Sequence, residues 1–241
     1  MSETMSIISQ YLSHTPLSGL VLTLVTYQLG HWVWRRAGMI PVLNPVMIAI
    51  ILIGLTLWLT GWSYQSYFQS AQLINFLLGP ATVALAIPLY RQMRLLLSSL
   101  GALAAGLIGG SAFAIISAVG FARLLGASEA TLRSLAPKST TSPIAMGISD
   151  QIGGIPALTA VLVILTGIVG SMMGPWILRL FRVRDERAQG VAIGTAAHGI
   201  GTARALQMGD ICGAFSGLAM GLNGVATAIL VPLLIHWLMG S

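Results

Sequence analysis

Charged side chains are the scarcest component of this chain. They make up 7% of its 241 residues, whereas hydrophobic residues make up 56% and the mean hydropathy is +0.87. A soluble domain carries about 25% charged residues, so this chain has too few to cover a water-facing surface. Apolar stretches recur from end to end. The composition therefore predicts a single all-α, polytopic membrane domain over residues 1–241, and excludes a soluble domain with an added anchor.

Cysteine is almost absent, and no cleavable signal peptide is expected. The single Cys212 excludes an internal disulfide and a cysteine-based metal site. The first apolar run begins near Pro16 and ends at Arg35 and Arg36, without small residues of a cleavage site. The excess of twelve Lys and Arg over six Asp and Glu does not indicate nucleic-acid binding. We expect these basic residues to mark the cytoplasmic side of the membrane.

Apolar runs of about 20 residues identify the membrane segments. We expect about seven or eight, at residues 16–34, 40–62, 73–90, 95–122, 139–153, 155–180, 189–206 and 211–238. Three of them do not read as plain helices. Segment 139–153 is short and polar, and the other two contain helix-breaking residues. These are Gly79, Pro80 and Pro88 in segment 73–90, and Gly194, Gly199 and Gly201 in segment 189–206.

The second half of the chain weakly repeats the first. A single shift of 115 positions, without gaps, aligns Gly38 with Gly153, Gly79 with Gly194, and Gln92-Met93 with Gln207-Met208. The predicted repeats cover about residues 16–126 and 131–241. Matching segments 40–62 and 155–180 end differently, in aromatic WSYQSYF and in basic RLFRVRDER. The C-terminal end of segment 40–62 thus suits the outer face of the membrane, and that of segment 155–180 suits the inner face. Matching segments that point in opposite directions are typical of transporters built from inverted repeats.

The count of basic residues favours a re-entrant hairpin at 139–153. If this segment enters and returns, three basic residues lie outside (Arg123, Arg133 and Lys138) and eight lie inside, namely Arg35, Arg36, Arg91, Arg94, Arg179, Arg182, Arg184 and Arg187. If it crosses the membrane, the best split is about seven to four. The positive-inside rule prefers the first arrangement by a small margin.

The hairpin carries the sequence KSTTSP, which predicts an anion site. Hydroxyls and free N–H groups precede Pro143, a residue favoured in the first turn of a helix. A helix start presents a positive dipole end, and Lys138 adds a full charge. A small carboxylate is the natural ligand, although a solvated helix cap explains the same residues. The residues assigned to this site are Lys138, Ser139, Thr140, Thr141 and Ser142.

Titratable side chains in the polar segments leave more than one interpretation open. Asp150 either carries a proton or cation, pairs with Lys138 or Arg204, or caps the following helix. His198 either binds substrate or carries a proton, or it is a neutral histidine bonded to a carbonyl. Arg204 either pairs with a carboxylate or extends to the interface. Thr195 and Thr202 lie between these groups in GTAAHGIGTARA and are assigned to substrate binding.

Two asparagines, Asn44 and Asn223, are expected within apolar helices. A lone intramembrane asparagine usually forms a hydrogen bond between helices, so we interpret both as structural, with lining of a transport path as the alternative. No nucleophile motif or metal-ligand spacing joins His198, Asp150 and Ser139. We therefore expect neither an enzyme nor a cofactor or metal.

Several long motifs resemble the LrgB/CidB family: FLLGPATVALAIPLY, APKSTTSPIA, GGIPALTA and GTAAHGIGTARA. The resemblance extends from about Leu43 to Val231. It implies a multi-pass protein of the bacterial inner membrane that works with a small LrgA/CidA-type membrane partner. Relatives include the plastid glycolate/glycerate translocator, and some bacterial pairs look like carriers of pyruvate. Others are described as antiholin-like regulators of murein hydrolases and lysis.

From the residues and the resemblance together we expect a transporter of small monocarboxylates such as glycolate, glycerate or pyruvate. Broken segments in matching halves are the best sequence indication of a transport site. The bilayer, an LrgA/CidA-type partner and a second copy in a homodimer are the expected partners, and coupling to protons is assigned to Asp150 or His198. The alternative is an antiholin-like regulator without a substrate of its own.

Overall fold

The computed structural model describes residues 17–38, 40, 43–84 and 86–239, and all of its regular elements in these ranges are helices. The all-α class is thus confirmed. The chain divides into two compact units, residues 1–84 (unit 1) and 85–241 (unit 2). Pro16, Pro41 and Leu85, which fall within the predicted segments, lie outside the described residues.

The described residues of unit 1 form four helices, of which α2 packs against α3. A Cβ on Gly30 of α2 would lie only 2.8 Å from Pro45 O at the start of α3, so this close approach requires glycine. Asn44 is an N-cap, not an intrahelical residue, because its Oδ1 accepts a hydrogen bond from Val46 N at 2.8 Å. The helices are α2 (Ser18–Arg36), α3 (Pro45–Thr60), α4 (Tyr64–Ser70) and α5 (Gln72–Ala84).

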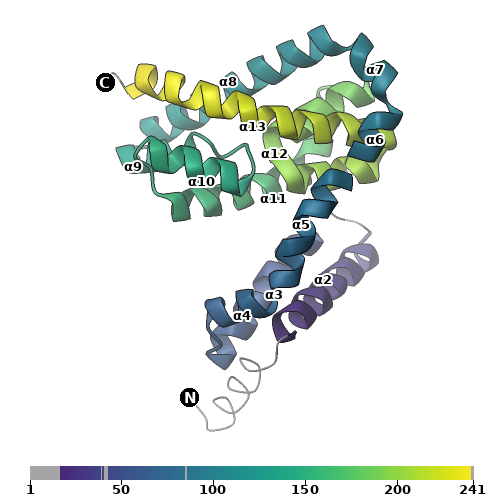
Figure 1. Cartoon of the computed structure of the whole chain (residues 1–241), viewed down its shortest axis with the longest axis vertical. Helices are drawn as coiled ribbons and strands as arrows, with labels where there is room; N and C mark the ends of the chain where they lie inside the picture. The colour runs from purple at the N-terminus through teal and green to yellow at the C-terminus, as the bar shows by residue number, and fades with distance from the viewer. Residues whose placement is uncertain (1–16, 39, 41–42, 85, 240–241) are drawn as a thin grey trace. The chain divides into compact units, whose positions relative to one another are not determined.

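Unit 2 is built around α13, which packs on α12, α8, α6 and α10 (Figure 1). Helix α11 packs on the other side of α12 and also contacts the short α9 and α10. The helices of this unit are α6 (Ala86–Arg91), α7 (Met93–Ser98), α8 (Leu100–Leu124), α9 (Glu129–Leu135), α10 (Ser142–Gln151), α11 (Pro156–Leu180), α12 (Glu186–Met208) and α13 (Asp210–Met239).

Three helices of unit 2 are long and apolar enough to cross a membrane: α8 and α11, with 25 residues each, and α13, with 30. Between 28% and 33% of their most apolar stretches is buried within the protein. The exposed remainder includes large apolar side chains such as Phe113, Val225 and Leu233. A soluble monomer rarely exposes such continuous apolar surface, whereas lipid tails cover it readily.

The predicted hairpin segment 139–153 contains one helix, α10, and so does not enter and return by itself; the hairpin in the structure is formed by α9 and α10, joined by the turn at residues 136–141. Helix α10 has ten residues, which span about 15 Å, half the thickness of the hydrocarbon core. It cannot cross the bilayer alone as a helix. Helices α9 and α10 contact each other and both pack on α11.

Three buried hydroxyl residues join this hairpin to α11, and we call them the Thr159 cluster: Ser134, Ser149 and Thr159. Thr159 Oγ1 lies 2.7 Å from Ser149 Oγ and 3.0 Å from Ser134 O, while Ser134 Oγ accepts from Ile155 N at 2.7 Å. A Cβ on Gly154 would lie 2.4 Å from Ser149 Oγ. The second glycine of the Gly153-Gly154 pair therefore allows the turn to close on this cluster.

Glycines predicted to break the helices have a different role in the structure. Gly194 lies inside α12, where a Cβ would come within 2.3 Å of Ser216 O on α13. Gly201 also lies within α12, but the atoms that a Cβ there would meet belong to Ala197 and Ile193 of the same helix, on the other side of the non-helical His198. In the first half, α5 continues through Gly79 and Pro80 to Ala84. Gly194 thus permits close contact between α12 and α13, as small residues commonly do between membrane helices.

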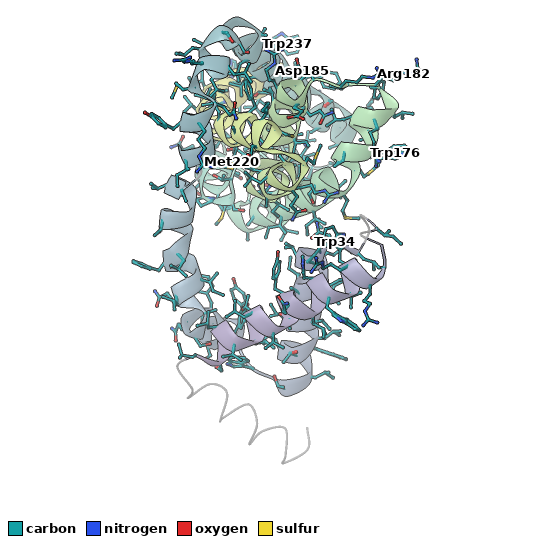
Figure 2. All side chains as sticks on the ribbon, turned by 90° about the vertical axis from the view of Figure 1, so that its right-hand side faces the viewer. Trp34, Trp176, Arg182, Asp185, Met220 and Trp237 are labelled. Carbon is teal, nitrogen blue, oxygen red and sulfur yellow. The ribbon has the colours of Figure 1, made fainter. Side chains whose placement is uncertain are left out.

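Aromatic and basic residues lie together where α11 ends. Exposed Trp176 and Arg182 lie on the outer side of unit 2, on α11 and the turn that follows it (Figure 2). Arg182 adopts a left-handed φ of 55°, which directs the chain from α11 into α12. Tryptophan and arginine at a helix end are typical of a membrane–water interface.

Candidate functional site

The break in α12 falls at His198, whose φ of 40° and ψ of −136° are not helical. The histidine ring fits against α11, because a Cβ on Gly167 would lie 2.7 Å from its Cε1. Its Nε2 lies 2.9 Å from Val163 O. A carbonyl only accepts hydrogen bonds, so Nε2 carries a proton. A left-handed conformation in a non-glycine residue stores strain, which is commonly found at functional sites.

The side chain of Asn223 joins four segments at the centre of unit 2. It is 1% exposed. Its Nδ2 donates to Ser139 O in the 136–141 turn at 2.9 Å and to Thr195 O in α12 at 3.1 Å. Its Oδ1 accepts from Ser111 of α8 and, at 3.5 Å, from Thr227. We call the group the Asn223 cluster: Ser111, Ser139, Thr140, Thr195, Asn223 and Thr227.

The break in α12 explains why this amide is needed. A non-helical residue removes hydrogen bonds from the turn that precedes it, and buried carbonyls freed in this way must find other donors. Thr195 O belongs to that turn, and Asn223 supplies the donor. The same amide binds Ser139 O in a turn that is not helical. Asn223 thus stabilises irregular backbone in two segments at once.

Two hydroxyls beside Asn223 are buried without any hydrogen-bond partner. They are Thr140 Oγ1 and Thr195 Oγ1. Thr140 Oγ1 lies 3.5 Å from the position of a Cβ on Gly224, next to Asn223. Thr195 also lines a cavity of about 540 Å³ between α8 and α12. Trp62 Nε1 of unit 1 is the other such atom in the described part of the chain. Unsatisfied buried polar groups are uncommon and require an explanation.

The predicted anion site lies at the start of α10, and its residues differ in burial. Ser139 and Thr140 are buried, whereas Lys138, Thr141 and Ser142 are half-buried. Lys138 Nζ donates to Ser139 Oγ at 3.2 Å. Helix α10 begins at Ser142, with Thr141 as N-cap and Pro143 in its first turn. The start of α10 therefore lies directly beside the Asn223 cluster.

Three further predicted residues lie at different places around this centre. Thr202 is buried, and its Oγ1 donates to His198 O at 2.9 Å and contacts Ser216 Oγ at 3.0 Å. Arg204 is half-buried near the end of α12 and donates to Gln207 Oε1 at 2.9 Å. Asp150 is exposed on α10. The structure thus brings Thr195 and the 138–142 residues together, but not Asp150.

The sequence had indicated little of the central role of Asn223 and Ser111. Asn223 is polar in an apolar helix, which signals a helix–helix hydrogen bond but does not name the partners. Ser111 lies in an apolar stretch that carries no motif. In the part of the chain that the structure describes, no group of three or more His, Cys, Asp or Glu side chains could hold a metal ion.

Comparison with known proteins places the chain in a family. The model of the LrgB-like family matches residues 23–237. The chain belongs to the LrgB-like family. It is 37% identical to the uncharacterized protein YwbG of Bacillus subtilis (strain 168) over 91% of this chain and 97% of that protein. The Bacillus subtilis protein YxaC is 36% identical over 91% of this chain and 94% of that protein.

A third relative carries a functional name. Antiholin-like protein LrgB of Bacillus cereus (strain B4264) is 32% identical over 91% of this chain and 95% of that protein. No solved structure matches the chain. The resemblance seen in the motifs is thereby confirmed, and the three apolar helices agree with a family of membrane proteins.

Proposed function

We propose that this LrgB-like protein carries small monocarboxylates such as glycolate, glycerate or pyruvate across the bacterial inner membrane. The observation that carries the proposal is the pair of unpartnered hydroxyls of Thr140 and Thr195 beside Asn223. A buried hydroxyl without a partner costs about 1–3 kcal/mol. A substrate oxygen that binds there during part of the transport cycle supplies the missing partner.

In this proposal the carboxylate binds at the start of α10. The N–H groups of the first turn and Lys138 favour a negative charge there. Thr140 and Thr195 bind the oxygen on the neighbouring carbon, with Ser139, Thr141 and Ser142 completing the cradle. His198, Thr202 and Arg204 form the α12 side of the path, where the strained His198 allows the two parts of the helix to move separately.

The proposed architecture is a pair of inverted repeats, and several helix ends support it. Helix α8 ends at Leu124 and α13 at Met239, which are 115 positions apart, the shift found in the sequence. Helices α5 and α6, over 72–91, correspond to residues 187–206 of α12. The counterpart of α2 differs, because Pro137 and Pro143 replace a continuous helix by the α9–α10 hairpin. Alternating access arises from movement of one part of the bundle against the other.

The proposal also includes coupling of transport to protons, through His198 or Asp150. It further includes a homodimer and an LrgA/CidA-type partner. His198 is the better of the two coupling residues, because it is buried at the helix break whereas Asp150 is exposed. Since Nε2 already carries a proton, a further proton would be taken up at Nδ1, and the hydrogen bond from Nε2 to Val163 O would be kept.

Transport by purified protein in liposomes tests the proposal. Radiolabelled glycolate, glycerate and pyruvate are supplied outside, and uptake is compared for the wild type, Lys138→Ala and His198→Ala. We expect uptake of at least one substrate, with a loss of about tenfold or more in both variants, since each removes a charge or hydrogen bond from the path. If both variants transport as the wild type does, the assigned site is wrong.

The name of the Bacillus cereus relative favours a second function, an antiholin-like regulator without its own substrate. That function gives no reason for unpartnered hydroxyls at the centre of unit 2. The two functions are separated by the same liposomes. If the protein is a regulator, liposomes that contain it take up no carboxylate. Deletion of its gene in cells would nevertheless change the activity of murein hydrolases.

A further inference from the structure

The cavity between α8 and α12 follows a groove in which the two helices run in the same direction. A Cβ on Gly106 would lie 3.6 Å from Val191, and one on Gly110 would lie 3.5 Å from Thr195. Small residues at every fourth position of α8 keep this groove open. The small residues that line it include Ala102, Gly106, Gly110 and Ala114 of α8 and Ala188 and Ala192 of α12.

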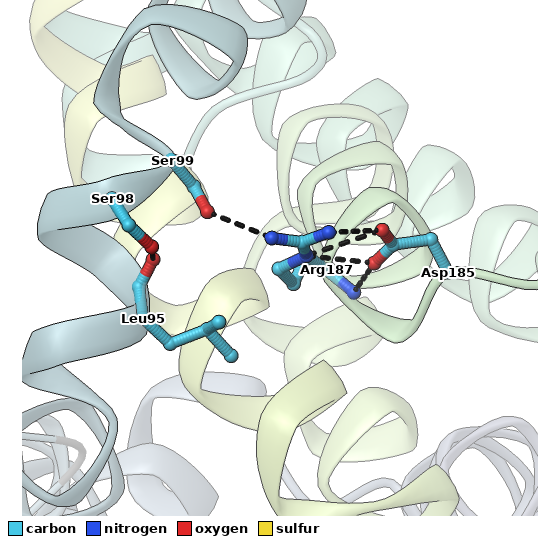
Figure 3. A network of polar contacts seen from close by, with 5 residues as sticks. All are labelled: Leu95, Ser98, Ser99, Asp185 and Arg187. Atoms are coloured by element: carbon cyan, nitrogen blue, oxygen red, sulfur yellow. Dashed lines mark hydrogen bonds and ion pairs between the residues drawn. The ribbon is translucent and has the colours of Figure 1, made fainter.

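One end of the cavity is polar and charged, and we call it the mouth: Ser98, Ser99, Asp185 and Arg187. Arg187 Nε donates to both carboxylate oxygens of Asp185, at 3.0 and 3.1 Å, and its Nη2 donates to Oδ2 at 2.6 Å. Its Nη1 donates to Ser99 Oγ at 3.2 Å (Figure 3). The guanidinium is thus held between α7–α8 and the start of α12.

The other end of the cavity reaches Thr195, whose hydroxyl is buried and unpartnered. Arg187 and Thr195 are eight residues apart on α12, which corresponds to about 12 Å along the helix. The cavity therefore joins a charged mouth near the end of the helix to the Asn223 cluster. A small molecule cannot contact both ends at once, so the two ends are successive positions along one route.

We propose that the mouth is an entry site for a monocarboxylate, at which Arg187 releases the carboxylate of Asp185 and binds that of the substrate. The inference rests on the proposed transport function. Asp185 and Arg187 already have the forked geometry with which arginine binds a carboxylate, so Asp185 occupies the place of the substrate. The side chains of Arg187 and Asp185 are 41% and 46% exposed. An exchange is easy, because exposed ion pairs contribute little stability.

Asp185 remains a competitor at physiological pH. Hydrogen bonds from the side chain and the backbone N–H of Arg187 lower the pKa of Asp185 to about 2. Asp185 is also the N-cap of α12, since its Oδ1 accepts from Arg187 N at 2.8 Å. Its carboxylate therefore stays ionised and close to the guanidinium until a second carboxylate displaces it.

The lining of the cavity also predicts a preference for substrates that carry a single carboxylate. Asp185 and Arg187 are the charged residues that line it, and the groove beyond them is formed mainly by alanine and glycine. A second carboxylate on the substrate would enter this apolar groove without a cation to balance it, which is unfavourable. Glycolate and pyruvate therefore fit the entry site better than succinate.

Four variants of the full-length protein in liposomes test the entry site, with glycolate as the probe. Arg187→Gln should raise the KM for glycolate about tenfold or more, because two charge-assisted hydrogen bonds are lost. Arg187→Lys keeps the charge but loses the forked pair of hydrogen bonds, so its KM should lie between those of Arg187→Gln and the wild type. Asp185→Asn keeps the helix cap and removes the competitor, so KM should fall roughly two- to fivefold. Arg184→Gln is the matched control, because Arg184 is exposed in the same turn but does not line the cavity.

The outcomes separate this inference from the proposed function. If the wild type transports glycolate but Arg187→Gln and Arg184→Gln have the same KM, the entry site is wrong and the transport function stands. If Asp185→Asn raises KM instead of lowering it, Asp185 is not a competitor and the exchange is wrong. If Arg187→Gln does not fold, Arg187→Lys and Asp185→Asn decide the question. If the wild type transports no carboxylate and none shifts its melting temperature, both proposals fail.

Discussion

Two groups of buried hydroxyls lie near the α9–α10 hairpin, and they differ in one respect. Every side-chain oxygen of the Thr159 cluster has a hydrogen-bond partner within the protein. In the Asn223 cluster, two of the threonine oxygens have none. A satisfied network stabilises one arrangement of helices. A network that is left open at two positions is less stable and is available to a ligand. Equal burial therefore does not mean an equal role.

The largest effect is expected for Asn223→Ala. The substitution leaves Ser139 O and Thr195 O without their donor and removes the acceptor of Ser111. We expect a loss of about 2–5 kcal/mol in the free energy of unfolding, which the melting temperature in detergent reports. Thr227→Val serves as a control, because its bond to Asn223 is long, at 3.5 Å. Equal melting temperatures for Asn223→Ala and the wild type would contradict the central role of the amide.

A smaller loss of stability is expected for Thr159→Val, which keeps the shape of the side chain but removes the hydroxyl. Ser149 Oγ and Ser134 O then lose a donor, at a cost of about 1–3 kcal/mol. For a chain of this size that corresponds to a fall of roughly 2–4 °C in melting temperature per kcal/mol. Uptake per folded molecule should not change. A selective loss of uptake would mean that the Thr159 cluster also serves transport.

Replacement of threonine by valine at the two unpartnered hydroxyls should have the opposite pattern of effects on stability and uptake. Thr195→Val and Thr140→Val remove hydroxyls that have no partner, so stability should stay the same or rise by about 1 kcal/mol. Uptake of glycolate should fall, because the substrate loses its partner. Melting temperature and uptake are measured on the same preparations. If these variants are destabilised as much as Thr159→Val, an internal water satisfies both hydroxyls, and the contrast between the clusters disappears.

The smallest effect is expected for Asp150→Asn. Asp150 is exposed near the end of α10, and its carboxylate belongs to neither cluster. Melting temperature and uptake driven by a pH gradient should stay within about a factor of two of the wild type, and His198→Ala provides the comparison. Loss of the pH dependence in Asp150→Asn alone would assign coupling to Asp150 and remove it from His198.

Membrane segments could be predicted from the sequence because apolar length and proline or glycine positions act locally. Segment 155–180 became α11 (Pro156–Leu180), and segment 211–238 became α13 (Asp210–Met239). The position of the break in α12 could not be predicted. Glycine is permissive but does not require a break, and in α12 it serves close packing on α13. The strained residue is His198, which is held by Gly167 and Val163 on another helix.

The sequence by itself determined the all-helical class and the family, and it predicted the short polar segment and the threonines of the candidate site. Each of these depends on residue type and local spacing. Only the tertiary structure decided which hydroxyls are satisfied, because hydrogen-bond partners come from helices distant along the chain. Asn223 meets Ser111, which lies 112 positions away, and Ser139, which lies 84 away. The tertiary structure also placed Arg187 and Asp185 at the mouth of a cavity that ends at Thr195, a relation that no local pattern encodes.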